Sequence, residues 1–167
     1  MAVTAGMVKE LREMTGAGMM DCKKALAATD GDMDKAVEFL REKGLAGAAK
    51  KAGRIAAEGV VVTALTADEK KAVVVEVNAE TDFVAKNEKF QTYAADVAAQ
   101  ALKTTAADMD AFMAEKWEKD PTLTVKEALS SQISIIGENM NIRRFEQVEE
   151  ADGFVASYIH GGGRSAF

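Results

Sequence analysis

One stretch of the sequence, residues 73–90, constrains the fold more than any other. It opens with a β-branched run, with valine at positions 73, 74, 75 and 77, which is typical of a buried strand. A short polar turn follows that holds Asp82 beside Phe83, and a helical pattern begins near Asn87. The stretch therefore predicts a strand, a connecting loop and a helix that packs on the same sheet.

The loop in this stretch is a candidate binding element, because a rigid scaffold can hold loop side chains out toward a partner. Phe83 lies where folding alone would favour a small or polar residue. Two interpretations stay open from the residues. Phe83 either folds back over the core beneath the loop or projects from the surface toward another molecule.

Residues 4–44 predict three short helices, with Thr4 as the N-cap of the first and Gly44 at the end of the third. Helices this short are marginal in isolation, so the three must share a core. The single cysteine, Cys22, lies on one of the predicted helix faces. We expect it to be a buried structural thiol.

The rest of the chain predicts an α+β body. Two β-branched runs, at residues 59–65 and 72–78, indicate an antiparallel hairpin. Further helices are expected at about 87–102, 107–118 and 124–138, and further strands at 141–149 and 153–160. The fold class is therefore α+β, with a three-helix bundle followed by a body in which helices pack on a small antiparallel sheet.

Composition suggests where these parts meet. Residues 46–56 are rich in alanine, lysine and glycine and predict a linker between a first domain at 1–45 and a core domain at 57–167. Residues 1–54 carry ten Lys and Arg against eight Asp and Glu, whereas residues 55–167 carry eleven against nineteen. An acidic body argues against direct nucleic-acid binding and favours a protein partner.

Enzymatic and metal chemistry find little support in the sequence. His160 is the only histidine, which excludes a His-based metal cluster, and no phosphate-binding Gly-rich motif with its Lys and hydroxyl residue occurs. We therefore expect no enzyme activity, no bound metal and no cofactor. No apolar run is long enough to span a membrane, and the first fifteen residues lack the apolar block of a signal peptide. A cytoplasmic protein without membrane contact is expected.

Three blocks of sequence resemble the bacterial elongation factor Ts family. The first is residues 81–87, Thr-Asp-Phe-Val-Ala-Lys-Asn; the second is residues 8–26; the third is residues 136–144, Ile-Gly-Glu-Asn-Met-Asn-Ile-Arg-Arg. They occur in the family's order, between about residue 4 and residue 164. The resemblance implies a ubiquitin-associated type of bundle at the N-terminus.

The resemblance also implies a function: guanine nucleotide exchange on elongation factor Tu during translation elongation, with binding to its GDP-bound and nucleotide-free forms. The residues that would displace Mg²⁺ from the partner are Thr81, Asp82, Phe83 and Val84. The residues that would contact the partner are Lys9, Arg12, Met19, Met20, Lys23, Ile136, Gly137 and His160.

Some of these residues also have plain structural interpretations. Adjacent helical residues differ by about 100° in direction, so one of Met19 and Met20 should fill the core and the other should be exposed. Gly137 is expected to cap a helix with positive φ, and both roles can hold together. His160 fits an exposed strand end equally well. Surface charge alone could account for the basic residues.

A passive protein-binding scaffold or assembly module without exchange activity is the alternative function, because three-helix bundles commonly bind other proteins. Family members usually continue past the Gly-Gly-Arg at residues 162–164 with an apolar strand. The resemblance thus implies a body that is incomplete at its C-terminus. It leaves exchange activity and homodimer formation open, and it implies an unpaired strand edge within residues 141–160.

Overall fold

The computed structural model of the protein describes residues 2–166, which divide into two compact units. Unit 1 runs to Gly53 and also includes Ser130–Gly137. Unit 2 contains Arg54–Leu129 and the chain from Glu138 onward. The α+β fold class predicted from the sequence is confirmed, with three N-terminal helices followed by an antiparallel sheet and its helices.

Unit 1 contains the three predicted helices, α1 (Ala5–Thr15), α2 (Met19–Ala28) and α3 (Met33–Lys51). Thr4 is the N-cap of α1, and its hydroxyl accepts a hydrogen bond from the backbone N–H of Met7 at 3.3 Å. The three helices share one small core, as short helices require. Its fully buried residues are Leu11, Cys22, Ala25, Leu26 and Ala36.

The prediction that the third helix ends at Gly44 is wrong, because α3 continues to Lys51. Gly44 packs against the C-terminal turns of α7 (Val125–Ile136): a β-carbon placed on it would lie 3.9 Å from the backbone of Ser130. Packing within unit 1 thus outweighs the poor helix propensity of glycine. The domain boundaries at residues 45 and 57 stay a prediction.

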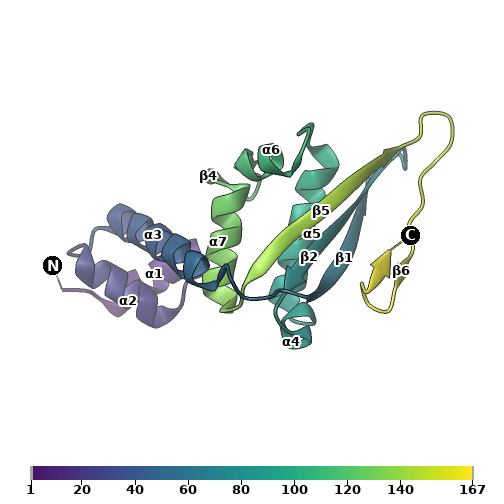
Figure 1. Cartoon of the computed structure of the whole chain (residues 1–167). Helices are drawn as coiled ribbons and strands as arrows, with labels where there is room; N and C mark the ends of the chain where they lie inside the picture. Colours follow the sequence, from purple (N-terminus) through teal and green to yellow (C-terminus); the bar gives the residue numbers. More distant parts are fainter. Residues whose placement is uncertain (1, 167) are drawn as a thin grey trace. The chain divides into compact units, whose positions relative to one another are not determined.

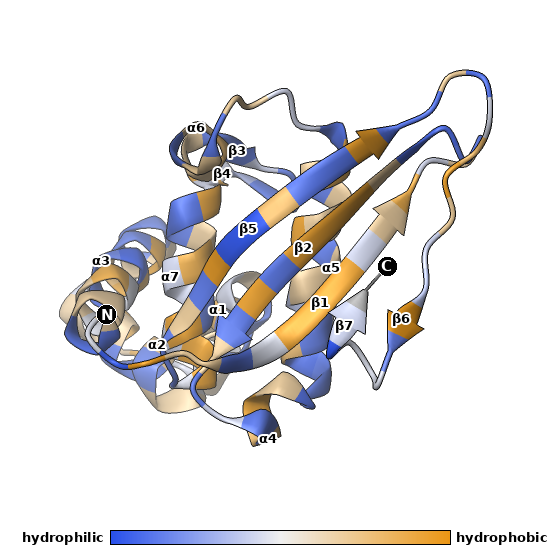
Figure 2. Cartoon of the chain, turned by 45° about the vertical axis from the view of Figure 1, so that its right-hand side comes forward, coloured by the Kyte–Doolittle hydropathy of each residue, from blue (hydrophilic) through white to orange (hydrophobic). Residues whose placement is uncertain are grey.

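The sheet of unit 2 has the order β1-β2-β5, formed by β1 (Glu58–Leu65), β2 (Lys71–Ala79) and β5 (Met140–Glu149). Both neighbouring pairs are antiparallel, which confirms the predicted hairpin and the first of the two later strands. Helix α5 (Glu88–Lys103) lies along β1 and β2, on one face of the sheet (Figure 1). Much of β1 and β2 is hydrophobic (Figure 2), as a strand beneath a helix requires.

Gly59 allows β1 to approach β2 closely. Its φ is +151°, and a β-carbon at this position would lie 2.2 Å from the carbonyl oxygen of Val77. A side chain cannot fit at that distance, so the pairing of these two strands depends on glycine here. This close pairing fixes the end of β2, from which the candidate site begins.

The helix predicted at 107–118 is shorter than expected, since α6 covers only Met109–Ala114. A hairpin of β3 (Lys116–Trp117) and β4 (Asp120–Thr124) follows it. The Gln100 side chain donates to the carbonyl of Lys116 and accepts from the N–H of Glu118, both at 2.9 Å. These bonds from α5 hold the hairpin backbone extended, and they outweigh local helix propensity.

The prediction of a second later strand at 153–160 is also wrong. Only Ile159–His160 forms a strand, β6, and it pairs with β7 (Ser165–Ala166) instead of extending the main sheet. Before β6, isolated bonds replace a strand ladder: the N–H of Val155 donates to the carbonyl of Glu69, in the β1–β2 turn, at 2.7 Å. Figure 1 shows this segment running back beside β1.

Candidate functional site

The candidate site is the segment that connects β2 to α5, here called the Thr81–Val84 loop. Its residues form a single helical turn, α4 (Asp82–Ala85), where the sequence predicted only a polar turn. Thr81 is the N-cap, and its hydroxyl accepts the N–H of Val84 at 3.3 Å. Ala85 is buried and anchors the turn on unit 2. The Asn87 side chain then caps α5 by accepting the N–H of Lys89.

Phe83 projects from this turn, with 82% of its surface exposed. The interpretation in which it folds back over the core is therefore wrong. A phenyl ring exposed to water has a higher free energy than a buried one, so its exposure costs stability. Its exposure beside ordered backbone is typical of a side chain that contacts another molecule.

Asp82 and Lys86 form an ion pair on the surface of the same turn. The Lys86 ammonium lies 2.8 Å from a carboxylate oxygen of Asp82, and both side chains are more than half exposed. The hydrogen bond from Lys86 and its positive charge lower the pKa of Asp82 below its usual value. Asp82 is therefore ionised at neutral pH and accessible to a partner.

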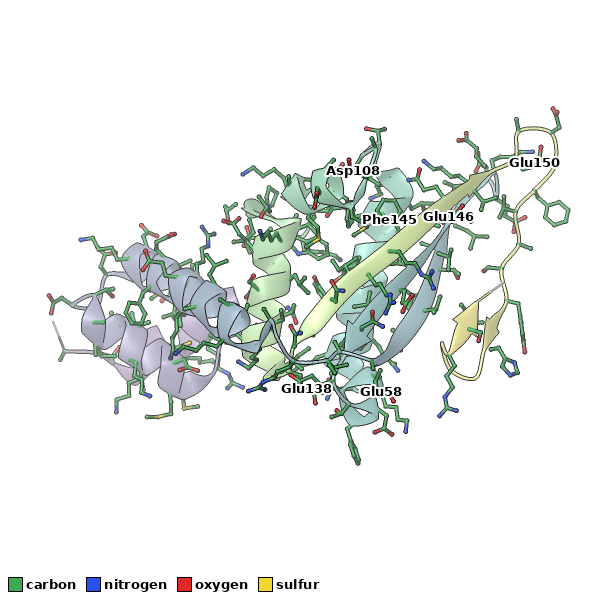
Figure 3. The ribbon with its side chains drawn as sticks, viewed as in Figure 1. Glu58, Asp108, Glu138, Phe145, Glu146 and Glu150 are labelled. Carbon is green, nitrogen blue, oxygen red and sulfur yellow. The ribbon has the colours of Figure 1, made fainter. Side chains whose placement is uncertain are left out.

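A second carboxylate holds the start of the loop. Glu138, in the short segment between α7 and β5 (Figure 3), accepts the N–H of Glu80 at 3.0 Å and the N–H of Thr81 at 3.1 Å. Its other oxygen accepts the Thr81 hydroxyl at 2.6 Å. Glu138 lies in the third of the family-like sequence blocks, at 136–144, and its role at the loop was not predicted from the sequence.

Glu80 makes the reverse connection. Its carboxylate accepts the N–H of Asn139 at 2.6 Å, and the Arg54 guanidinium lies 3.5 Å away. The Asn139 side chain in turn donates to the carbonyl of Arg54 at 2.7 Å. Polar bonds thus join three segments of unit 2 that are distant in the sequence. The sequence holds no local signal for contacts of this separation.

The predicted contact residues on α1 and α2 belong to unit 1. Met19 and Met20 are 59% and 61% exposed, so the expectation that one of them fills the core is wrong. Both lie in the first turn of α2, whose buried side consists of later residues, from Cys22 to Leu26. Lys9, Arg12 and Lys23 are all exposed.

The end of α7 belongs to unit 1 as well. Gly137 has φ +88°, and its N–H donates to the carbonyl of Ile133 at 2.9 Å, which confirms the predicted helix cap. Ile136 is half-buried. A β-carbon on Gly16 would lie 3.5 Å from the side chain of Ile135, so the end of α7 contacts the turn that precedes α2.

His160 lies elsewhere in unit 2, exposed on β6. Its Nδ1 is 3.0 Å from the hydroxyl of Tyr158, and the two ring centroids are 5.9 Å apart. Because β6 pairs with β7, His160 lies outside the three-stranded sheet that carries the Thr81–Val84 loop.

Residues 2–166 contain neither a candidate metal site nor a candidate membrane-spanning helix. Within this part of the chain, no group of three or more His, Cys, Asp or Glu side chains could hold a metal ion. In the same residues, no helix combines the length and the apolar character needed to cross a membrane.

Comparison with known proteins gives consistent matches. A family model described as "Elongation factor TS" matches residues 80–167. The chain is 60% identical over 162 residues to elongation factor Ts of Clostridium novyi, covering 97% of this chain and 53% of the relative. It is 58% identical to that of Hydrogenovibrio crunogenus, covering 96% and 54%, and 52% identical to that of Trichlorobacter lovleyi, covering 98% and 53%. The chain spans about half the length of the curated relatives it matches.

Proposed function

Because the chain belongs to the elongation factor Ts family, we propose that it is a guanine nucleotide exchange factor. It binds elongation factor Tu in the GDP-bound and nucleotide-free forms and promotes GDP release during translation elongation in the bacterial cytoplasm. The observation that carries the proposal is Phe83, an aromatic side chain 82% exposed on a firmly anchored turn.

In the proposed mechanism, Phe83 enters an apolar gap between helices of the partner and forces them apart. Asp82 competes for polar groups that support the partner's Mg²⁺, while Thr81 and Val84 hold the turn in shape. Mg²⁺ joins protein groups to phosphate oxygens, so its displacement loosens the phosphates of GDP. No covalent bond is made or broken.

Most of the binding free energy comes from a wider surface. A tenfold loss of GDP affinity requires about 1.4 kcal/mol of preferential binding to the empty partner. We assign the docking contacts to exposed residues of unit 1 and to the end of α7, with one contact from β6. These residues are Lys9, Arg12, Met19, Met20, Lys23, Ile136, Gly137 and His160. Replacing Arg12 or Met20 by Ala should raise the dissociation constant.

The decisive experiment replaces Phe83 by Ala and follows release of a fluorescent GDP analogue from the partner. We expect the maximal release rate at saturating factor to fall about tenfold or more, while the half-saturating concentration changes little. Phe154→Ala is the matched control, since Phe154 is also exposed, at 71%, but lies outside the site. If the partner releases GDP equally fast with the Phe83→Ala variant and with the Phe154→Ala variant, Phe83 does not act as a wedge.

The passive binding module is supported by one observation, the exposed methionines of unit 1. Met14, Met19 and Met20 are each more than half exposed, and flexible Met side chains suit a binding surface. Such a module would bind elongation factor Tu and leave the rate of GDP release at its spontaneous value. The same release assay therefore separates the two functions.

A further inference from the structure

We propose that Glu138 is a positioning residue for the exchange reaction. Its carboxylate fixes the backbone at the start of the Thr81–Val84 loop and thereby sets the direction in which Phe83 projects. The inference rests on the proposed function, because positioning matters only if the loop acts on a partner. Glu138 itself need not touch that partner.

The geometry supports a specific clamp. One oxygen of Glu138 accepts two consecutive backbone N–H groups, those of Glu80 and Thr81, and the other accepts the Thr81 hydroxyl. A carboxylate has about four acceptor positions and no donor when ionised, so it suits three converging donors. Hydrogen bonds to a charged acceptor are stronger than those between neutral groups.

The Thr81 hydroxyl transmits this contact into the turn. It donates to Glu138 and at the same time accepts the N–H of Val84, the residue that follows Phe83. The direction of the first bond leaves a lone pair of the hydroxyl for the second. The hydroxyl oxygen of Thr81 thus links the carboxylate of Glu138 to the backbone of the turn.

The reciprocal bond from Asn139 to Glu80 makes the connection two-way. Glu138 holds the backbone of the loop, and Glu80 holds the backbone that follows Glu138. Neither side chain is fully exposed. Each segment therefore restrains the other, and neither can move alone without losing a bond to a carboxylate.

The turn needs such support because it cannot order itself. Helix α4 has four residues, far below the length at which an isolated helix is stable. Phe83 adds little packing, since most of its surface is in water. If the turn were loose, ordering it on binding would use free energy that could otherwise force the partner open.

The test compares Glu138→Ala with Glu138→Gln. Alanine removes all three acceptor contacts, whereas glutamine keeps the length and one oxygen that can accept the two backbone N–H groups. We expect the maximal GDP release rate to fall about tenfold for Ala and about threefold for Gln, in line with the strength of charge-assisted bonds. The half-saturating concentration should change less than about twofold, because neither substitution alters any of the assigned docking residues.

Hydrogen exchange in the free chain supplies a readout independent of the partner. In Glu138→Ala, the amides of Glu80 and Thr81 should lose protection, while the amide of Val75 in the middle of β2 should keep it. Glu146→Ala is the control, since it removes a carboxylate from β5, the strand that follows Glu138, at a distance from the loop (Figure 3). It should change neither exchange nor release.

The outcomes separate the two proposals. Unchanged protection at Glu80 and Thr81 would overturn the clamp. Lost protection with normal GDP release, in an assay where Phe83→Ala is slow, would overturn the positioning role and leave the exchange function intact. If the unaltered chain does not accelerate release at all, the exchange function itself fails, and the positioning role fails with it.

Discussion

Among single residues, Tyr93 is placed most unusually. Its ring packs beside Trp117, with centroids 5.8 Å apart, and only 4% of the residue is exposed. Within the described chain its hydroxyl has no hydrogen-bond partner. Burial raises the pKa of Tyr93 above its ordinary value, because the phenolate would lose its hydration.

This burial predicts a pH dependence of stability. The unfolded chain ionises Tyr93 near pH 10, whereas the folded chain keeps it neutral, so stability is retained below about pH 10 and lost above it. In Tyr93→Phe, urea unfolding should show a smaller alkaline loss and a cost at pH 7 below about 1 kcal/mol. The exposed Tyr158→Phe should keep the full alkaline loss; equal behaviour of the two variants would contradict the prediction.

Single residues also show how much of the site the sequence could predict. The sequence pattern marks Phe83 as unusual but does not decide whether it covers the core or projects from the surface. Its 82% exposure in the structure decides for the surface. Helix geometry predicted one of Met19 and Met20 in the core and the other exposed, but both are exposed. Glu138 was not recognisable as a site residue, because its contact with Thr81 joins residues separated by 57 positions.

At the level of helices and strands, α3 contains two glycines yet remains helical to Lys51. Packing does not require glycine at position 47. A β-carbon on Gly47 would lie 3.9 Å from Ser134 Oγ, which is an ordinary contact. Gly16 differs, because it caps α1 with φ +67°. The same residue type thus has opposite roles at two places in unit 1.

We therefore predict opposite effects of the same substitution. Gly47→Ala should stabilise α3 by about 0.5–1 kcal/mol, because alanine loses less backbone entropy on forming a helix. Gly16→Ala should destabilise the chain by about 1 kcal/mol, because a side chain strains the left-handed conformation. Thermal unfolding of both variants checks this, and a shift of both in one direction would show that the interpretation is wrong.

Sequence periodicity predicted the helices and strands well where the burial of side chains follows the local sequence pattern. The helix expected at 87–102 is Glu88–Lys103, and its apolar stripe faces the sheet. Prediction failed where a distant side chain decides the backbone, as Gln100 does for the hairpin after α6. It also failed at 153–160, where bonds to the β1–β2 turn replace strand pairing.

At the scale of the whole molecule, the proposed exchange reaction is a competition between two ligands of one partner. In this proposal, exposed residues of unit 1 serve in docking, and unit 2 carries the turn with Phe83. Thermodynamic linkage requires that a factor which weakens GDP binding is itself weakened by GDP to the same extent. The coupling can therefore be measured from either side.

We predict that the two measurements agree. The ratio of factor affinities for the nucleotide-free and GDP-bound partner should equal the ratio of GDP affinities without and with factor. Phe83→Ala should reduce both ratios together, since it removes part of the coupling. Isothermal titration calorimetry gives all four constants. Ratios that stay at the values of the unaltered chain in Phe83→Ala would contradict a role of Phe83 in the coupling.

The ion pair between Asp82 and Lys86 affects how any such encounter proceeds. Asp82 already has a cationic neighbour before it meets another protein, so an arriving basic group must substitute for a resident one. Swapping one pairing for another yields little net energy in water. In the proposed mechanism, Asp82 therefore adds little to the affinity for the partner, and the affinity comes from the assigned docking residues.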